Sequence, residues 1–147
     1  IRSDFSIGSG CIADLIKHTL ASELHQLTGG IHVVALAGAD GIITVSEDIG
    51  RHNALDRVIG YGLRNGIDFS RTFILVSGRV SSEMARKCLI ANIPIIASRG
   101  ATTTLALEVA VKNGLTIVGF VRGLKMNVYT HTKRVKVTRQ QGSTGSA

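Results

Sequence analysis

The sequence predicts an α/β protein, a three-layer α/β/α sandwich whose mixed sheet begins with an antiparallel hairpin. Two β-rich runs, at 31–37 and 42–47, flank Asp40-Gly41, a dipeptide that favours a tight hairpin turn. After the hairpin, short apolar runs alternate with helical patterns, and such connections require parallel strands and right-handed crossovers. The runs at 73–76 and 95–97 are continuously apolar, which is typical of strands buried on both faces.

Helices are predicted where apolar residues recur at three- and four-residue steps. The first covers about residues 9–27, with Ser9 as its cap. The second covers 51–65, with Leu63 on its inward face and Gly66 at its C-terminal end. The remaining predicted elements are a strand at 72–76, a helix at 81–91, a strand at 94–97, a helix from Thr102 or Thr103 to 112, and strands at 115–121 and 126–129.

The composition predicts one globular domain. The 147 residues are 44% hydrophobic and 18% charged, and a domain of this size buries roughly two thirds of its unfolded surface. No apolar run approaches the roughly 20 residues that a membrane helix needs. The predicted organisation is an N-terminal helix region at 1–23 within the same domain, an α/β core at 24–132 and a basic flexible tail at 133–147. Because the chain starts at Ile1 without an initiator Met, we expect it to be part of a longer protein.

The net charge of +7 indicates an anionic partner, although part of it lies in the predicted tail. The absence of Trp and the small number of other aromatic residues argue against general single-strand nucleic-acid binding. The two cysteines, Cys11 and Cys88, cannot build a disulfide framework, so we expect a reducing, cytoplasmic setting. Cys88 shares a helical face with Met84 and is predicted to be a buried core residue.

Four loops at predicted strand ends carry the candidate site. They lie at 48–52, 77–82, 98–104 and 120–125, and each contains a glycine and an arginine. Ligands of open α/β sheets bind at the carboxyl ends of the strands, and helix N-termini favour anions. Since three of these loops run into predicted helices, the pattern predicts a ligand that carries phosphate. The candidate contacts in the first three loops are Arg51, His52, Ser77, Arg79, Thr102 and Thr103.

Each of these residues also has an ordinary structural interpretation. The threonines can be helix caps, and Asp48 or Glu47 can be ion-pair partners of Arg51 or Arg79. His52 can donate a proton or contact the ligand, or it can form local hydrogen bonds near the start of its helix. His32, inside the first predicted strand, is expected to be a core or edge histidine. The zinc deaminase signature, His-x-Glu with Pro-Cys-x-x-Cys, is absent from the sequence.

Several blocks together resemble the FdhD family of formate dehydrogenase accessory sulfurtransferases. The blocks are Thr28-Gly29-Gly30-Ile31-His32, residues 47–56 (Glu-Asp-Ile-Gly-Arg-His-Asn-Ala-Leu-Asp), Val76-Ser77-Gly78-Arg79, Ala101-Thr102-Thr103-Thr104-Leu105-Ala106 and residues 115–120. The resemblance runs from about Leu24 to Thr130, in order and with similar spacing. It implies a cytidine-deaminase-like fold without the zinc site.

The resemblance also implies a function. Such a protein receives sulfur from a cysteine desulfurase and passes it to the molybdenum (or tungsten) of the bis-molybdopterin guanine dinucleotide cofactor required by formate dehydrogenase. The resemblance further implies that the protein is a homodimer. The guanine-dinucleotide-binding stretch of the family falls on Phe120, Val121, Arg122, Gly123, Leu124 and Lys125 in this sequence.

The sequence departs from the family pattern in its cysteines. The sulfur-carrying cysteine of the family belongs to a Cys-x-x-Cys loop that precedes the Thr-Gly-Gly block, and this chain has no such pair. Cys11 precedes the block alone, at a predicted helix start that could lower its thiol pKa. We therefore expect this chain to bind the cofactor without transferring sulfur. The alternatives are a non-catalytic cofactor-binding chaperone for formate dehydrogenase and, third, a metal-independent deaminase-like hydrolase.

Overall fold

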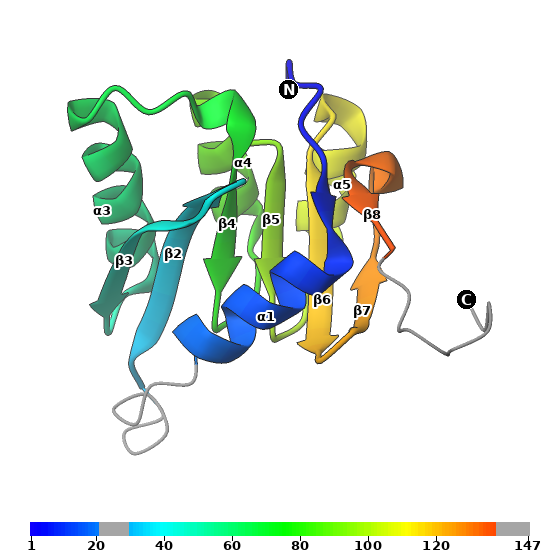
Figure 1. Ribbon diagram of the computed structural model, residues 1–147, viewed down its shortest axis with the longest axis horizontal. Coiled ribbons are helices and arrows are strands. Elements are labelled where there is room, and N and C mark those ends of the chain that lie inside the picture. The colour runs from blue at the N-terminus through cyan, green and yellow to red at the C-terminus, as the bar shows by residue number, and fades with distance from the viewer. Residues whose placement is uncertain (21–29, 138–147) are drawn as a thin grey trace.

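A six-stranded mixed sheet forms the centre of the computed structural model, which describes residues 1–20 and 30–137 (Figure 1). The strand order is β3-β2-β4-β5-β6-β7. The strands are β2 (His32–Gly38), β3 (Gly41–Asp48), β4 (Thr72–Val76), β5 (Ile95–Ser98), β6 (Thr116–Arg122) and β7 (Lys125–Val128). The predicted strands are thus present, with ends that differ by at most one residue.

The directions of the strands decide where the loops lie. The hairpin strand β2 is antiparallel to both β3 and β4, whereas β4, β5 and β6 are parallel to one another. Strands β3, β4, β5 and β6 therefore all end at the same edge, which is the lower edge in Figure 1. Strand β7 returns antiparallel to β6.

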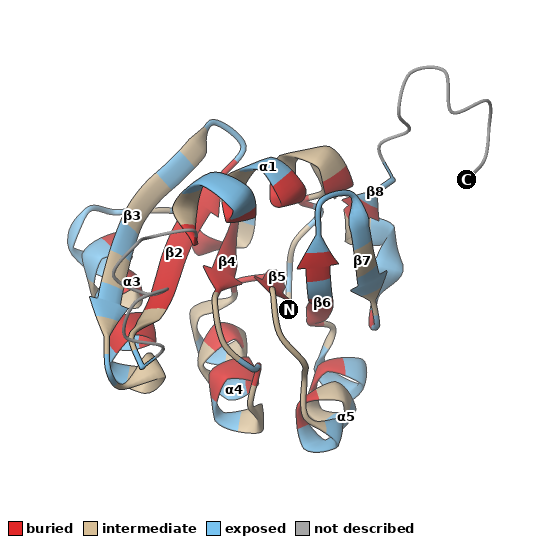
Figure 2. Ribbon diagram, turned by 90° about the horizontal axis from the view of Figure 1, so that it is seen from below, coloured by how far each residue is buried: buried red, intermediate tan, exposed pale blue. Residues whose placement is uncertain are grey.

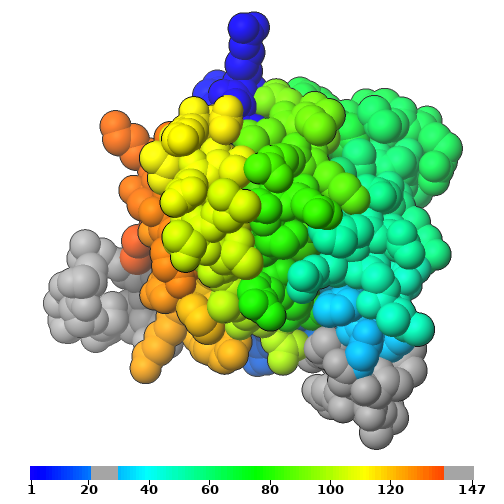
Figure 3. Space-filling model, turned by 180° about the vertical axis from the view of Figure 1, so that it is seen from behind, coloured from blue at the N-terminus to red at the C-terminus, as the bar shows by residue number. Residues whose placement is uncertain are grey.

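Helices cover both faces of the sheet (Figure 2). Helices α3 (Arg51–Arg64), α4 (Ser82–Ala91) and α5 (Thr104–Asn113) form one layer, seen from outside in Figure 3. Helix α1 (Ser9–Thr19) covers the other face, beside a short parallel pair formed by β1 (Ile7–Gly8) and β8 (Val135–Lys136). The predicted three-layer α/β/α architecture is confirmed.

The core lies on both sides of β4, as the continuous apolar pattern predicts. Phe73 and Leu75 pack under α1, while Ile74 and Val76 pack under the opposite helices, and all four are at most 1% exposed. Alternate residues of a strand point to opposite faces, so a strand covered twice is apolar at every position. Cys88 is fully buried in this core, which confirms its predicted place.

The first helix and the basic tail differ from the sequence prediction. Helix α1 begins at Ser9, with Gly8 rather than Ser9 as its N-cap, and it ends at Thr19; the rest of the predicted helix lies outside the described residues. The tail predicted from residue 133 begins too early, because Val135 is buried in β8 and the short helix η2 (Thr132–Arg134) precedes it. The guanidinium of Arg134 donates to backbone carbonyls at the amino ends of β5 and β6.

Helix α3 buries a glycine where a leucine was expected. Leu63 is 69% exposed, which contradicts its predicted inward position, and Gly62 is buried instead. A Cβ atom on Gly62 would lie 2.6 Å from two ring carbons of Phe69, in the short helix η1 (Phe69–Arg71). The last turn of α3 therefore packs backbone against an aromatic ring, and its leucine points to solvent.

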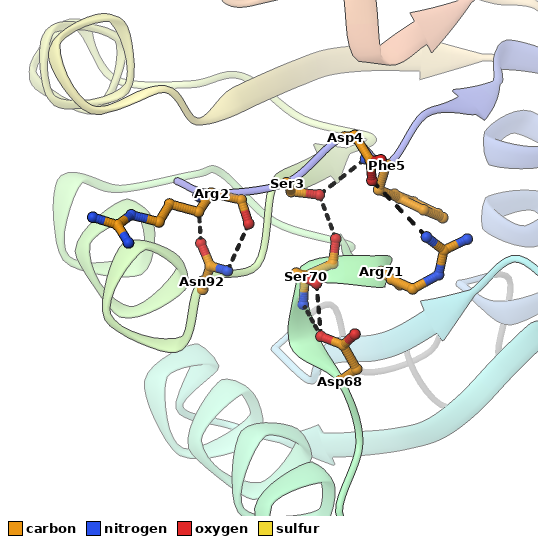
Figure 4. A network of polar contacts seen from close by, with 8 residues as sticks. All are labelled: Arg2, Ser3, Asp4, Phe5, Asp68, Ser70, Arg71 and Asn92. Carbon is orange, nitrogen blue, oxygen red and sulfur yellow. Dashed lines mark hydrogen bonds and ion pairs between the residues drawn. The ribbon is translucent and has the colours of Figure 1, made fainter.

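The N-terminal segment lies across the edge opposite to the predicted site (Figure 4). The side chain of Asn92 bonds both backbone groups of Arg2, at 2.8 and 2.9 Å. The ring of Phe5 stacks on Phe73 with centroids 6.2 Å apart, and the guanidinium of Arg71 lies 5.9 Å from the Phe5 centroid. These contacts fix the amino edge of the sheet and leave the carboxyl edge to the four loops.

Candidate ligand-binding site at the carboxyl edge of the sheet

The four predicted loops lie together at one edge of the sheet, the edge that faces the viewer in Figure 2. Helices α3, α4 and α5 each begin there, so their N-terminal N–H groups are directed toward this edge. Backbone bonds join the loops: Phe120 N–H donates to the Gly100 carbonyl at 3.0 Å, and Val80 N–H donates to the Ala101 carbonyl at 3.0 Å. The expected convergence of the loops is thus present in the fold.

The loop between β3 and α3 is fixed by Asp48. One carboxylate oxygen accepts from the Gly50 N–H at 2.8 Å, and the other lies 2.9 Å from Arg57 Nη2. The ion-pair partner of Asp48 is therefore Arg57, nearly two turns into α3, and not Arg51 or Arg79 as the sequence suggested. The pKa of Asp48 is lowered, first because the Gly50 N–H bonds the carboxylate and further because Arg57 is close.

Asp48→Asn should lower the unfolding free energy at neutral pH, and the difference from the native chain should shrink as the pH falls below about 4. A carboxylate with a lowered pKa in the folded state stabilises the fold above its unfolded pKa, and this contribution is lost when the folded state takes up the proton. Urea denaturation between pH 2 and 7 measures this dependence. Arg57→Gln should show part of the same effect, and an unchanged pH dependence in Asp48→Asn would contradict it.

Helix α3 begins with the two most distinctive predicted residues. Its N-cap is Gly50, which supplies no side-chain hydrogen bond, so its first N–H groups have no side-chain cap within the described structure. Arg51 is half-buried at the first position. His52 Nε2 lies 3.5 Å from Glu83 Oε2 at the start of α4, and its Nδ1 is buried without a hydrogen-bond partner among the described residues.

The next two loops combine an exposed arginine, Arg79, and a half-buried one, Arg99, with hydroxyls that have structural partners. Ser77 Oγ accepts from the Val33 N–H at 3.0 Å. Thr103 caps α5, because its hydroxyl accepts from the Ala106 N–H at 3.1 Å. The backbone of Thr102 forms an isolated parallel β-bridge with Val80. Ser81 caps α4 in the same way, because its hydroxyl accepts from the Met84 N–H. The hydroxyls of Ser77, Ser81 and Thr103 therefore hold the loops in place. Arg79 is exposed between them.

The hairpin between β6 and β7 supplies the fourth loop. Phe120 is 45% exposed and has φ +51°, a left-handed conformation that is uncommon for an aromatic residue. Val121 is buried, whereas Arg122, Gly123, Leu124 and Lys125 are exposed. Arg122 Nη1 donates to the Arg99 carbonyl at 2.7 Å, and Gly123 turns the chain at φ +55°. The predicted stretch therefore contributes an aromatic ring and two cations.

Two residues at this edge, Ser98 and His32, are not among the predicted contact residues. Ser98 is fully buried; its hydroxyl donates to the Gly78 carbonyl and accepts from the Gly100 N–H at 2.8 Å, which joins two loops. His32 begins β2 opposite Asp48, and a Cβ on Gly78 would lie 3.0 Å from its Nδ1. The position of His32 follows from the direction of β2, whose amino end meets the carboxyl ends of its neighbours.

The two thiols, Cys11 and Cys88, lie outside the four loops of the candidate site. The pKa of Cys11 is raised, mainly by burial and further by the nearby Asp14 carboxylate, so the expected lowering at the helix start is wrong. Burial raises the pKa of Cys88 to about 12. In residues 1–20 and 30–137, no three His, Cys, Asp or Glu side chains gather where they could hold a metal ion. Within the same residues, no helix has the length and hydropathy of a membrane span.

The fold and the site together define an α/β/α domain of the cytidine-deaminase-like class, with arginines and helix N-termini gathered at one edge. Solved deaminases share this fold. A diaminohydroxyphosphoribosylaminopyrimidine deaminase/reductase from Thermotoga maritima superposes with a TM-score of 0.60 over 78% of this chain and 38% of its own, at 12% identity. The guanine deaminase from Nitrosomonas europaea gives 0.55 over 83% of this chain and 81% of its own, at 7% identity. At such identities the likeness shows the fold alone.

The chain belongs to the FdhD/NarQ family, whose model matches residues 2–136. The sulfur carrier protein FdhD of Thermoplasma volcanium is 46% identical over 138 residues, which are 92% of this chain and 50% of that protein. The Streptomyces coelicolor protein of the same name is 44% identical over 89% of this chain and 48% of its own. This chain thus spans about half the length of the curated relatives it matches.

A solved structure supports the same assignment. A protein from Desulfotalea psychrophila, described as a formate dehydrogenase accessory protein, superposes with a TM-score of 0.83 at 31% identity. The match covers 90% of this chain and 60% of that protein. The resemblance to the FdhD family that the sequence blocks indicated is confirmed.

Proposed function

We propose that this chain is the part of a formate dehydrogenase sulfurtransferase that binds the guanine-dinucleotide form of the molybdenum cofactor. The observation that carries the proposal is the convergence of four arginine- and glycine-containing loops with three helix N-termini at one sheet edge. Preorganised N–H groups and guanidinium groups are the donors that bind phosphate most strongly. A nucleotide diphosphate is the anion that fits this arrangement.

The residues present suit both parts of a guanine nucleotide. Arg51, Arg79, Arg122 and Lys125 supply positive charge for the phosphates. The exposed ring of Phe120 offers a flat apolar surface on which a base can stack. In this chain's share of the work, these groups hold and orient the cofactor as a client molecule, and the sheet edge fixes their spacing.

The proposal for the whole protein adds a cysteine that carries sulfur as a persulfide between a cysteine desulfurase and the bound cofactor. The thiols of the described chain favour a binding role for this part, because one is fully buried and the pKa of the other is raised. The second candidate function is therefore a non-catalytic chaperone that docks the cofactor on formate dehydrogenase. Persulfide formation on a family-length protein, measured by mass spectrometry after incubation with a desulfurase, separates the two. We further propose a cytoplasmic homodimer.

GDP should bind this chain measurably more tightly than GMP or ADP in calorimetric titration, because the site is expected to recognise both the base and the diphosphate. Arg122→Ala should weaken GDP binding by about 10- to 150-fold, since hydrogen bonds to charged groups contribute about 1.5–3 kcal/mol. Lys125→Ala, which removes an exposed charge, should weaken it less. Lys112→Ala, at the far end of α5, is the control and should leave the affinity unchanged. Equal binding of GDP and ADP would contradict guanine recognition.

A further inference from the structure

A small basic pocket lies on the α1 face of the sheet, beside the carboxyl edge. It has a volume of about 230 Å³ and is lined by Ala13, Ile16, Lys17, Arg99, Val121, Arg122 and Gly123. Its side of the sheet is set by Val121, which belongs to the core under α1, and by Arg99, whose Nη1 donates to the Leu20 carbonyl at 2.8 Å. The caps and helix N-termini of α3, α4 and α5 lie on the other face.

Three cations from three different elements surround this pocket. Lys17 comes from α1, Arg99 follows β5 and Arg122 ends β6, and none of the lining residues is acidic. Within residues 1–20 and 30–137, none of the three is in an ion pair. Like charges that are brought together oppose folding, so such a cluster is stabilised when an anion lies between them.

The two arginines are held in place before any ligand arrives. Arg122 Nη1 donates to the Arg99 carbonyl at 2.7 Å, and Arg99 Nη1 donates to the Leu20 carbonyl. A guanidinium has five N–H donors in total, so each arginine keeps donors for a ligand. A guanidinium that is already oriented also loses less conformational freedom when it binds. The floor is apolar, formed by Ala13, Ile16 and Val121, and a poorly hydrated floor strengthens the attraction between the cations and an anion.

From this geometry we infer that Lys17, Arg99 and Arg122 bind a phosphate or diphosphate group on the α1 face. The volume is below the 300–1,000 Å³ typical of pockets that enclose a whole small ligand, so the pocket takes the anionic part and leaves the remainder outside. Arg122 is shared with the predicted guanine-dinucleotide stretch, whereas Lys17 and Arg99 are additional. The identity of the nucleotide rests on the proposed function; the anion site rests on the pocket.

The test compares inorganic pyrophosphate, GDP and guanosine in calorimetric titrations, with Lys17→Gln as the principal variant. Lys17 is exposed on α1, so its replacement leaves the fold intact. Both anions should bind, guanosine should bind more weakly than GDP, and Lys17→Gln should weaken pyrophosphate and GDP alike by roughly tenfold. Arg99→Lys keeps the charge but loses the planar fork, and it should weaken both by a similar factor. Lys112→Gln is the matched lysine control.

Backbone NMR shifts locate the anion independently of affinity. Pyrophosphate should shift the amides of Lys17, Val121 and Gly123, whereas the amide of Lys112, at the far end of α5, should not move. Tight GDP binding that is indifferent to Lys17→Gln and Arg99→Lys would overturn the inference and leave the proposed function standing. If pyrophosphate binding depends on both residues but GDP binds no more tightly than pyrophosphate, the pocket is upheld. The missing contribution of the base would then count against the guanine-dinucleotide role. Failure of pyrophosphate to bind would overturn the inference.

Discussion

Phe120→Ala and Phe120→Gly should each weaken GDP binding by about 5- to 150-fold, because stacking of a base on an aromatic ring contributes about 1–3 kcal/mol. Phe120 is 45% exposed at the carboxyl edge, and its backbone is held there because its N–H donates to the Gly100 carbonyl at 3.0 Å. Calorimetric titration of both variants measures the loss. Unchanged affinity in both would remove the ring from the site.

The same two variants separate ligand contact from backbone strain. Phe120 has φ +51°, and a non-glycine residue pays about 1–2 kcal/mol in the left-handed region. Both substitutions remove the ring, but only glycine also removes the strain. The free energy of unfolding, measured by urea denaturation, should therefore be about 1 kcal/mol higher for Phe120→Gly than for Phe120→Ala. Such a result would show that the native conformation of Phe120 is strained, and strained residues of this kind cluster at functional sites. Equal stability of the two variants would show that the strain is no larger than the effect of glycine on the unfolded chain, about 0.4–1 kcal/mol.

Gly62→Ala should destabilise the protein by about 1–3 kcal/mol, even though alanine is the better helix former, because overpacking a core costs this much. Its Cβ would lie 2.6 Å from Cε1 and Cζ of Phe69 and 3.4 Å from Cδ2 of Leu36. Phe69 is only 9% exposed, so its ring cannot move away freely. Urea denaturation measures the change in the free energy of unfolding.

Gly60→Ala is the matched control in the same helix. There the added Cβ would lie 3.2 Å from Arg64 Nη1, the far end of an exposed side chain that can move aside. This substitution should therefore stabilise the protein by about 0.5–1 kcal/mol. If both substitutions stabilise, Phe69 adapts to the extra methyl group, and the close packing inferred at Gly62 is wrong.

The sequence alone determined the secondary structure well where local signals are strong. Asp40-Gly41 placed the hairpin turn, and Gly41 has φ +116° there. Ser81 caps α4, and Thr103, one of the two predicted starting positions, caps α5; both act through their side-chain hydroxyls. These features depend on neighbouring residues of the chain, and turn and cap chemistry is therefore readable without the fold. The continuous apolar strands likewise indicated burial on both faces.

The tertiary structure decided what lies next to what. The direction of β2 brings His32 to the carboxyl edge, and the packing of α1 brings Lys17 beside Arg99. Asp48 forms its ion pair with Arg57 and not with Arg51, which is closer in the sequence. Helix α3 buries Gly62, while Leu63 faces solvent. These pairings join residues through strand order and helix orientation, which sequence spacing does not encode. The sequence therefore determined the elements and the chemistry of the four loops, whereas the three-dimensional packing decided which side chains share a pocket.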